Sequence, residues 1–365
     1  MSAIDNNNNN NLTSPPNEHN NTEALSKVYS SPHLNSSRVI DFSKHNPTLD
    51  SVNVPLITYT HIPSDEETAD VLLNMFTRRI FCVEIENYSL EEKKRLLELY
   101  EFLKLKSFQI PTTYKYFDLF KQYQGQNFDL EKTFVEVIKE LCFKCEKLPV
   151  LLNDKIKEIL NKGFIYVHGR DNRYRPLIFI KPSKYKELTD YSNEECKDSI
   201  VFFIEFLIHK CLIPGVVESW NIILDVEGIS VMDIAKLKEV FGIIKGIYRC
   251  RLYKLYLVNL NAFFTIIWNI AKNFMGSTLD AKAVKVDSKE GTYPLLFDRI
   301  NKGQVEKKYG GESENLTEGF FPPKFKNGHF YASNDGKASE ICLNNEIDFI
   351  KENGEIYYEV TEDYD

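Results

Sequence analysis

The hydrophobic positions of the N-terminal third follow a helical pattern. Ser89 and Glu92 have the spacing of a capping box in front of a helix over Lys93–Leu105. A further helix is predicted between Asp129 and Leu148, because its apolar residues share one helical face: Leu130, Phe134, Val137, Ile138, Leu141 and Cys145. Pro149 ends that pattern. We therefore expect an N-terminal helical region over residues 65–160.

The pattern changes at residue 163, where short apolar runs appear. They span residues 164–167, 177–180, 220–226, 255–260 and 283–286. Longer amphipathic stretches separate the later runs, at 193–211, 232–245 and 262–275. Continuous apolar strands that alternate with helices indicate a sheet covered on both faces. We expect an α/β unit with a mainly parallel or mixed sheet, and one more helix over residues 293–302.

The two ends of the chain differ from this middle part in composition. Residues 1–64 contain the homopolymer Asn6–Asn11 and are predicted to be a disordered, Asn-rich extension. Residues 313–365 form an acidic C-terminal tail, within which a strand over Glu355–Val360 is conceivable. Residues 337–365 have a net charge of −7, so the rest of the chain, at −1, is close to neutral. This balance argues against a nucleic-acid-binding protein and against constitutive attraction to anionic membranes.

Cysteine usage and hydropathy indicate the cellular compartment. Seven cysteines at irregular spacing suggest reduced thiols, and the chain starts without a signal-peptide pattern. No apolar run reaches the roughly 18 residues that a membrane-spanning helix needs. We expect a cytoplasmic protein that associates with membranes only transiently.

Motifs for catalysis or metal binding are weak in this chain. Cys142-Phe-Lys-Cys145 lies inside a predicted helix and has no second cysteine pair to complete a zinc site. His168-Gly-Arg-Asp171 superficially resembles the catalytic loop of a protein kinase. The chain has neither the glycine-rich phosphate loop nor the Asp-Phe-Gly motif that a kinase also needs. No nucleophile elbow or Walker-type loop occurs. We therefore expect no enzymatic activity, no catalytic residues and no bound metal, although a cryptic hydrolase remains a third hypothesis.

The segment Asn261–Met275 is the most informative one. Its apolar residues cover more than one helical face: Phe263, Phe264, Ile266, Ile267, Trp268, Ile270, Phe274 and Met275. A helix that is apolar almost all round is either buried on both sides or in contact with lipid. Taken alone, the segment fits a buried core helix better than a helix in contact with lipid. The motifs around it in the chain decide between the two.

Several motifs occur in the order seen in the CRAL-TRIO family of lipid-binding and lipid-transfer proteins. Asn127-Phe-Asp-Leu-Glu-Lys132 resembles the family's "KFDVEKA" helix start, and Gly169-Arg-Asp-Asn-Arg-Tyr-Arg-Pro176 its "GxDxxGRP" hairpin. Ile223-Leu-Asp-Val-Glu-Gly-Ile-Ser230 resembles "xxDxxGxS", and Tyr253–Leu260 the "FYIINAP" strand. Lys308-Tyr-Gly-Gly311 resembles the closing "EYGG". The resemblance covers roughly residues 89–312, and it implies a CRAL-TRIO-like lipid-binding domain over residues 161–312.

In that family a gate helix covers a lipid pocket, and Asn261–Met275 falls at its position. The resemblance implies a protein, of the yeast phosphatidylinositol/phosphatidylcholine transfer type, that encloses one phospholipid or other hydrophobic ligand and exchanges it at membranes. The residues expected to bind the lipid are Ser230, Lys282, Phe263, Phe264, Ile267 and Trp268. No cofactor is expected beyond the bound lipid, and a transient membrane surface is the expected partner of a monomer. The alternative is a scaffold whose pocket is collapsed or permanently filled.

Departures from the family leave the identity of the lipid open. Phosphatidylinositol-transfer members have a Lys before "FD", a Glu in "YPE" and a Lys after the gate helix. The matching positions here are Asn127, Cys250 and Lys282, so only the last is kept. Ser230 matches a hydroxyl that contacts the headgroup in phosphatidylcholine-binding members, and Met232 replaces a Ser or Thr common two positions later.

Overall fold

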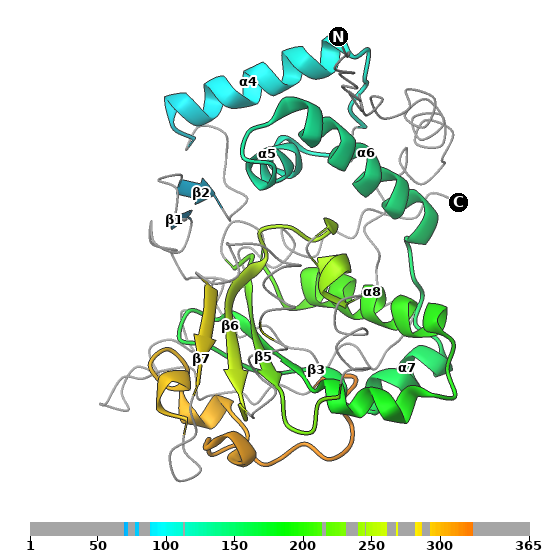
Figure 1. Ribbon diagram of the computed structural model, residues 1–365, viewed down its shortest axis with the longest axis vertical. Coiled ribbons are helices and arrows are strands. Elements are labelled where there is room, and N and C mark those ends of the chain that lie inside the picture. The colour runs from blue at the N-terminus through cyan, green and yellow to red at the C-terminus, as the bar shows by residue number, and fades with distance from the viewer. Residues whose placement is uncertain are drawn as a thin grey trace, which may run out of the picture.

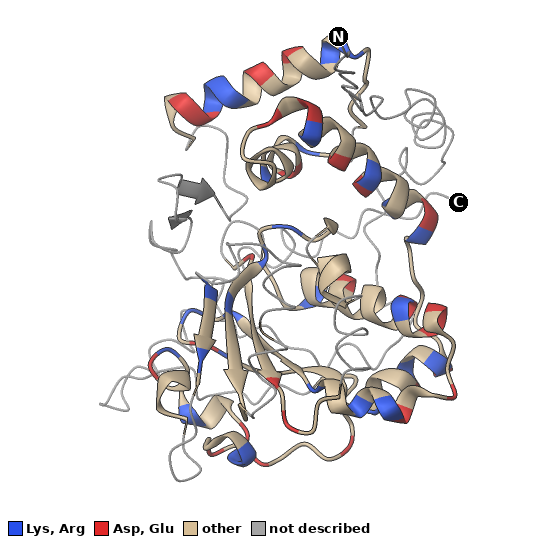
Figure 2. Ribbon diagram, in the orientation of Figure 1, with Lys and Arg blue, Asp and Glu red and all other residues tan. Residues whose placement is uncertain are grey.

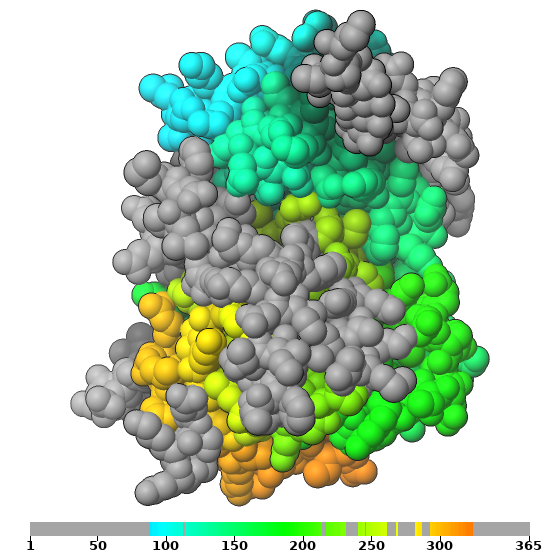
Figure 3. Space-filling model, viewed as in Figure 1, coloured from blue at the N-terminus to red at the C-terminus, as the bar shows by residue number. Residues whose placement is uncertain are grey.

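The computed structural model places a group of helices beside a five-stranded sheet (Figure 1). It describes residues 88–111, 114–213, 217–230, 240–244, 246–260, 268, 282–286 and 293–323, and the backbone of residues 69–71 and 77–79. Charged side chains lie mainly on the helices and at strand ends, whereas β5 and β6 are largely uncharged along their length (Figure 2). In the space-filling view the N-terminal helices form the upper part of the molecule and the sheet lies below them (Figure 3).

Three helices form the N-terminal region: α4 (Leu90–Leu105), α5 (Tyr116–Gly125) and α6 (Leu130–Lys147). The predicted capping box of α4 is present, since the Ser89 Oγ accepts from the Glu92 amide at 3.2 Å and the Glu92 carboxylate accepts from the Ser89 amide at 2.7 Å. The predicted apolar face of α6 packs into the core shared by the three helices, and the helix ends before Pro149. The sequence pattern thus located α4 and α6 correctly, whereas α5 had not been predicted as a separate helix.

A short antiparallel pair of strands precedes the helices, formed by β1 (Ala69–Val71) and β2 (Thr77–Arg79). The prediction that the whole of residues 65–160 is helical was wrong for these strands. Apolar spacing in segments as short as three residues does not distinguish a strand from a helix.

The sheet has the order β3-β4-β5-β6-β7. Its strands are β3 (Ile165–Arg170), β4 (Pro176–Ile180), β5 (Trp220–Asp225), β6 (Leu252–Val258) and β7 (Ala283–Lys285). The first two form an antiparallel hairpin, and β4 to β7 are parallel. The predicted mixed, mainly parallel sheet is confirmed, with all five expected strands in place.

Both faces of the sheet are covered. On one face the strands pack with α7 (Asp154–Asn161) and α8 (Asn193–Lys210), and we call this the α8 face. The other face packs against three short 3-10 turns, η5 (Pro294–Leu296), η6 (Lys302–Gln304) and η7 (Lys307–Tyr309). A fourth turn, η4 (Pro182–Leu188), follows β4. Because side chains alternate along a strand, Ile222 points to the α8 face and Ile223 to the other.

The single helix predicted over residues 293–302 was wrong. The structure has η5 and η6 there, separated by an irregular stretch. Asn301 explains the break, since its side chain caps the second turn by accepting from the Gly303 amide at 2.8 Å. The carbonyl of Arg299 is also used elsewhere, accepting from the amide of Asn172 at 2.9 Å. Gly228 and Gly310, within the motifs at 223–230 and 308–311, have left-handed φ values of 64° and 78°.

Candidate functional site

The apolar α8 face of the sheet is the candidate lipid-binding surface. Its floor is built from alternate residues of the central strands: Ile178, Ile180, Ile222, Leu224, Leu255 and Leu257. Trp268 is helical, is only 8% exposed, and packs in the same hydrophobic cluster as these side chains. The Nζ of Lys285 lies 5.6 Å from the centroid of its ring. The residue expected at the centre of the gate helix therefore belongs to the same hydrophobic core as the expected floor.

Three of the six predicted lipid-binding residues can be located. Ser230 is exposed beyond the end of β5, Lys282 directly precedes β7, and Trp268 packs on the floor. Phe263, Phe264 and Ile267 lie outside the described residues, as does Met232.

The structure does not bring Ser230 and Lys282 together. Strands β5, β6 and β7 are parallel, and Ser230 follows the carboxyl end of β5 whereas Lys282 precedes the amino end of β7. A strand of six residues is roughly 20 Å long. One headgroup therefore cannot contact both side chains, and the two mark opposite ends of the floor.

Lys282 belongs to a group of cations at the amino ends of β6 and β7, which appears blue in Figure 2. Its Nζ donates to the Leu252 carbonyl at 2.5 Å. Arg249 and Arg251 lead into β6 and are bound by carboxylates, those of Glu136 at 3.0 Å and Glu218 at 3.2 Å. A phosphate at this end of the sheet would thus meet Lys282 beside arginines that already have partners.

Cys250 stands between these two arginines. It is half-buried and has a left-handed φ of 61°. Its thiol stands where the resemblance to phosphatidylinositol-transfer members implies a Glu side chain.

The motif Gly169–Pro176 turns out to build a buried polar network. The Asp171 Oδ1 accepts from the amides of Arg173 and Arg175, both at 2.9 Å. Its Oδ2 accepts from Arg175 Nη1 at 3.1 Å and from Asn221 Nδ2 at 2.9 Å. Sequence reasoning missed Asn221, although an Asn between Trp and Ile in an apolar strand was a signal. The network fixes the hairpin to β5, a structural role.

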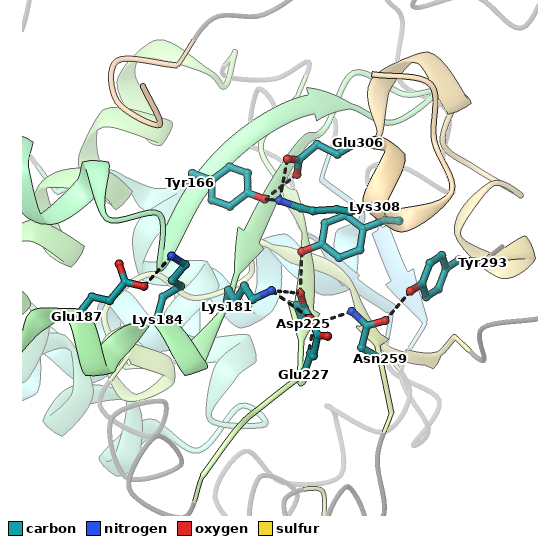
Figure 4. A network of polar contacts seen from close by, with 11 residues as sticks. Tyr166, Lys181, Lys184, Glu187, Asp225, Glu227, Asn259, Tyr293, Glu306 and Lys308 are labelled. Carbon is teal, nitrogen blue, oxygen red and sulfur yellow. Dashed lines mark hydrogen bonds and ion pairs between the residues drawn. The ribbon is translucent and has the colours of Figure 1, made fainter. Parts of the chain in front are cut away.

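A second network surrounds Asp225 at the carboxyl ends of the parallel strands (Figure 4). This buried carboxylate accepts from Tyr309 Oη at 2.9 Å and Asn259 Nδ2 at 2.8 Å, and pairs with Lys181 Nζ at 3.2 Å. Tyr293 Oη donates to the Asn259 side chain. Burial, and then the nearby charge of Asp225, raise the pKa of Tyr309 well above its ordinary value. The Tyr309 hydroxyl therefore stays a donor, and it ties η7 to the strand end.

Among the described residues, a surface cavity of about 410 Å³ lies between α6, α7 and α8. Its lining includes Lys155, Glu195 and Asp198 beside Val150 and Leu151. Charged walls of this kind do not suit acyl chains, so this cavity is separate from the candidate floor.

The described residues bear on the expectations about metals and membranes. They contain no cluster of three or more His, Cys, Asp or Glu side chains that could hold a metal ion. They also include no helix long and apolar enough to cross a membrane. Cys142 and Cys145 both lie on α6, as expected, and are half-buried.

Comparison with known protein families supports the motifs. Residues 160–311 match the family model described as the CRAL/TRIO domain. A search of solved structures finds one titled "Crystal structure of Sfh5", at 17% sequence identity and a TM-score of 0.43, covering 74% of this chain and 100% of that chain. A likeness at that level carries no argument. The comparison with curated proteins found no match.

Proposed function

We propose, because residues 160–311 match the CRAL/TRIO domain model, that this chain encloses one phospholipid or other hydrophobic molecule and exchanges it at membranes. The observation that carries the proposal is the apolar α8 face, on which Trp268 packs within the same hydrophobic cluster. The polar networks at Asp171 and Asp225 shape and brace this sheet.

The energetics of a bare lipid explain why such a shelter is useful. Each methylene exposed to water costs about 0.8 kcal/mol. A two-chain phospholipid with about 30 methylenes would therefore lose on the order of 20 kcal/mol in water. A pocket that buries the chains again removes most of this barrier, and a helix apolar on several faces can open where it meets acyl chains.

Specific roles follow for the predicted residues. Phe263, Phe264, Ile267 and Trp268 form the lid, Lys282 meets a phosphate at the amino end of the floor, and Ser230 contacts polar groups at its carboxyl end. The proposed domains are the extension 1–64, the helical region 65–160, the lipid-binding domain 161–312 and the tail 313–365. The first residues of the tail still pack against the lipid-binding domain, since Phe321 is buried in the core of the α8 face. In a cell the protein would be cytoplasmic and only transiently bound to membranes.

A scaffold with a filled pocket is the second candidate. Trp268 packs directly in the cluster that forms the floor, so the space is closed at this residue. A permanently closed lid would leave a binding module that never exchanges lipid.

Lipid extraction separates these two functions. We expect native mass spectrometry of the purified full chain to show one bound lipid, and the protein to move labelled phosphatidylcholine between liposomes. Trp268→Asp should stay folded and lose transfer, whereas Trp268→Phe should keep most of it. Absence of lipid together with absence of transfer would favour the scaffold. Global unfolding of Trp268→Asp would mean that the segment is ordinary core.

A further inference from the structure

Trp220 has a buried donor without an acceptor. The residue is 0% exposed, and its indole N–H makes no hydrogen bond with any residue that the structure describes. Burying such a group unpaired costs about 1 to 3 kcal/mol, and native proteins rarely leave one without a reason. An indole nitrogen can only donate. The missing partner must therefore be an acceptor.

The position of Trp220 places this donor in the candidate site. It is the first residue of β5, and its side chain belongs to the hydrophobic cluster of the α8 face together with Ile222 and Trp268. The next residue, Asn221, points to the opposite face, where its side-chain amide donates to Asp171. The donor thus lies on the face that the lipid would occupy.

Trp220 also lies at the cationic end of that face. It pairs with Leu252 on β6, and its backbone amide donates to the Arg251 carbonyl at 2.8 Å. Leu252 in turn accepts from Lys282 Nζ. Trp220 therefore starts its strand at the amino ends of the parallel strands, and its backbone lies beside Leu252, the residue bonded to Lys282. This is where the polar part of a lipid would meet a positive charge.

We propose that the Trp220 indole N–H donates a hydrogen bond to an oxygen of the bound glycerophospholipid, either an ester carbonyl or a phosphate oxygen. The inference rests on the proposed function and adds a selectivity element to it. A hydrocarbon ligand leaves the N–H unpaired, whereas an oxygen acceptor satisfies it. The binding free energy gained from this hydrogen bond corresponds to about a five- to tenfold preference for the oxygen-bearing ligand.

The chain has only two tryptophans, Trp220 and Trp268, so its indole N–H spectrum contains two signals. The test uses the delipidated full chain labelled with ¹⁵N-tryptophan, loaded with phosphatidylcholine, dioleoylglycerol or hexadecane. Trp220→Phe and Trp268→Phe assign the signals. We expect the Trp220 signal to move downfield with phosphatidylcholine and not with hexadecane. A shift with dioleoylglycerol identifies an ester oxygen, and a shift with phosphatidylcholine alone identifies the phosphate.

Occupancy measured by native mass spectrometry keeps the two proposals apart. If lipid binds but the Trp220 signal is the same with phosphatidylcholine and hexadecane, the inference is overturned and the proposed function stands. If no ligand binds, both are overturned. As a second readout, Trp220→Phe should lower the ratio of phosphatidylcholine to hexadecane occupancy by about five- to tenfold. The ratio cancels the effect of the smaller ring, and Lys302→Ala, on the other face of the sheet, should leave it unchanged.

Discussion

Lys282 lies half-buried at the amino end of β7, where its Nζ donates to the Leu252 carbonyl. The hydrogen bond fixes the position of the ammonium group. Lys282 can therefore bind a lipid phosphate without a large further loss of side-chain conformational entropy. Its neighbours Arg249 and Arg251 already bind carboxylates, so they contribute less to attraction for an anionic headgroup. Selectivity for anionic lipid should therefore depend on Lys282 and be modest.

The first prediction removes this cation. Lys282→Ala should lower the binding of phosphatidylinositol relative to phosphatidylcholine by about two- to fivefold, the range expected for a partly solvated ion pair. Competition between the two lipids in liposomes, read by mass spectrometry of the bound lipid, measures it. Lys302→Ala is the control, because this exposed Lys lies on the other face of the sheet. An unchanged ratio in Lys282→Ala would remove the residue from the site.

The second prediction concerns Asp225, whose buried carboxylate holds Lys181 and Tyr309. Asp225→Asn replaces an acceptor by a donor that faces these donors, and it leaves Lys181 with a weaker partner. We expect a loss of about 2 to 4 kcal/mol in the free energy of unfolding, measured in urea. Glu227→Gln is a matched control, since Glu227 also contacts Lys181 but is 68% exposed, and should cost under about 0.5 kcal/mol. Equal effects of the two changes would contradict the assigned role of the network.

At the scale of elements, the hairpin of β3 and β4 depends on close contact with η6. Gly169 has a left-handed φ of 72°, and a β-carbon there would lie 2.2 Å from the Gln304 carbonyl oxygen. The amide of the next residue, Arg170, donates to the Gln304 side chain at 3.0 Å. The strand and the turn are thus held too close for any side chain at position 169.

The third prediction tests this contact. Gly169→Ala should destabilise the protein by about 3 kcal/mol or more, because overpacking adds to the strain of the left-handed backbone. Gly319→Ala is the matched control, since Gly319 has a similar φ of 64° but no atom within 4 Å of its added β-carbon. It should cost only about 1 to 2 kcal/mol. Thermal unfolding of both variants measures the difference, and similar melting temperatures would argue against the contact.

The strands and helices were predictable wherever one periodicity ran over enough residues. The run at 220–226 and the capped helix after Ser89 gave clear signals, and both elements are present. The prediction of a helix over residues 293–302 was wrong because the apolar residues there pack onto the sheet from an irregular backbone. Helical spacing in the sequence does not reveal this. The motifs located the ends of the sheet, but the separation of Ser230 and Lys282 required the parallel topology. The unpaired N–H of Trp220 could not be predicted, because it depends on what surrounds the ring.

At the scale of the whole molecule, the helical region and the sheet domain have separate hydrophobic cores. The core of α4, α5 and α6 contains no residue of the sheet among its buried members. Between the two cores lie ion pairs that cross from α5 and α6 to the sheet domain: Lys121 with Glu218, Arg249 with Glu136, and Lys147 with Asp198. The contact between the two parts is therefore largely polar, and specific in geometry.

The Lys121–Glu218 pair is the most buried of these contacts. The two residues are 7% and 2% exposed, the Nζ lies 2.8 Å from the Glu218 Oε2, and Arg251 Nη1 binds the same oxygen at 3.2 Å. One carboxylate thus compensates two cations, one from each part of the molecule. Its removal leaves a buried Lys without a counter-charge, which costs far more than the loss of an exposed pair.

The fourth prediction follows from this arrangement. Glu218→Gln should lower the free energy of unfolding by about 3 to 5 kcal/mol, whereas Glu136→Gln, at a half-buried pair, should cost about 1 kcal/mol or less. Because the two cores are separate, the loss should fall mainly on the helices. Hydrogen exchange should show α5 and α6 losing protection in Glu218→Gln while β4 and β5 keep theirs. A uniform loss over both parts would mean that the polar layer joins them into one cooperative unit, and that the helices do not open independently of the lipid-binding sheet.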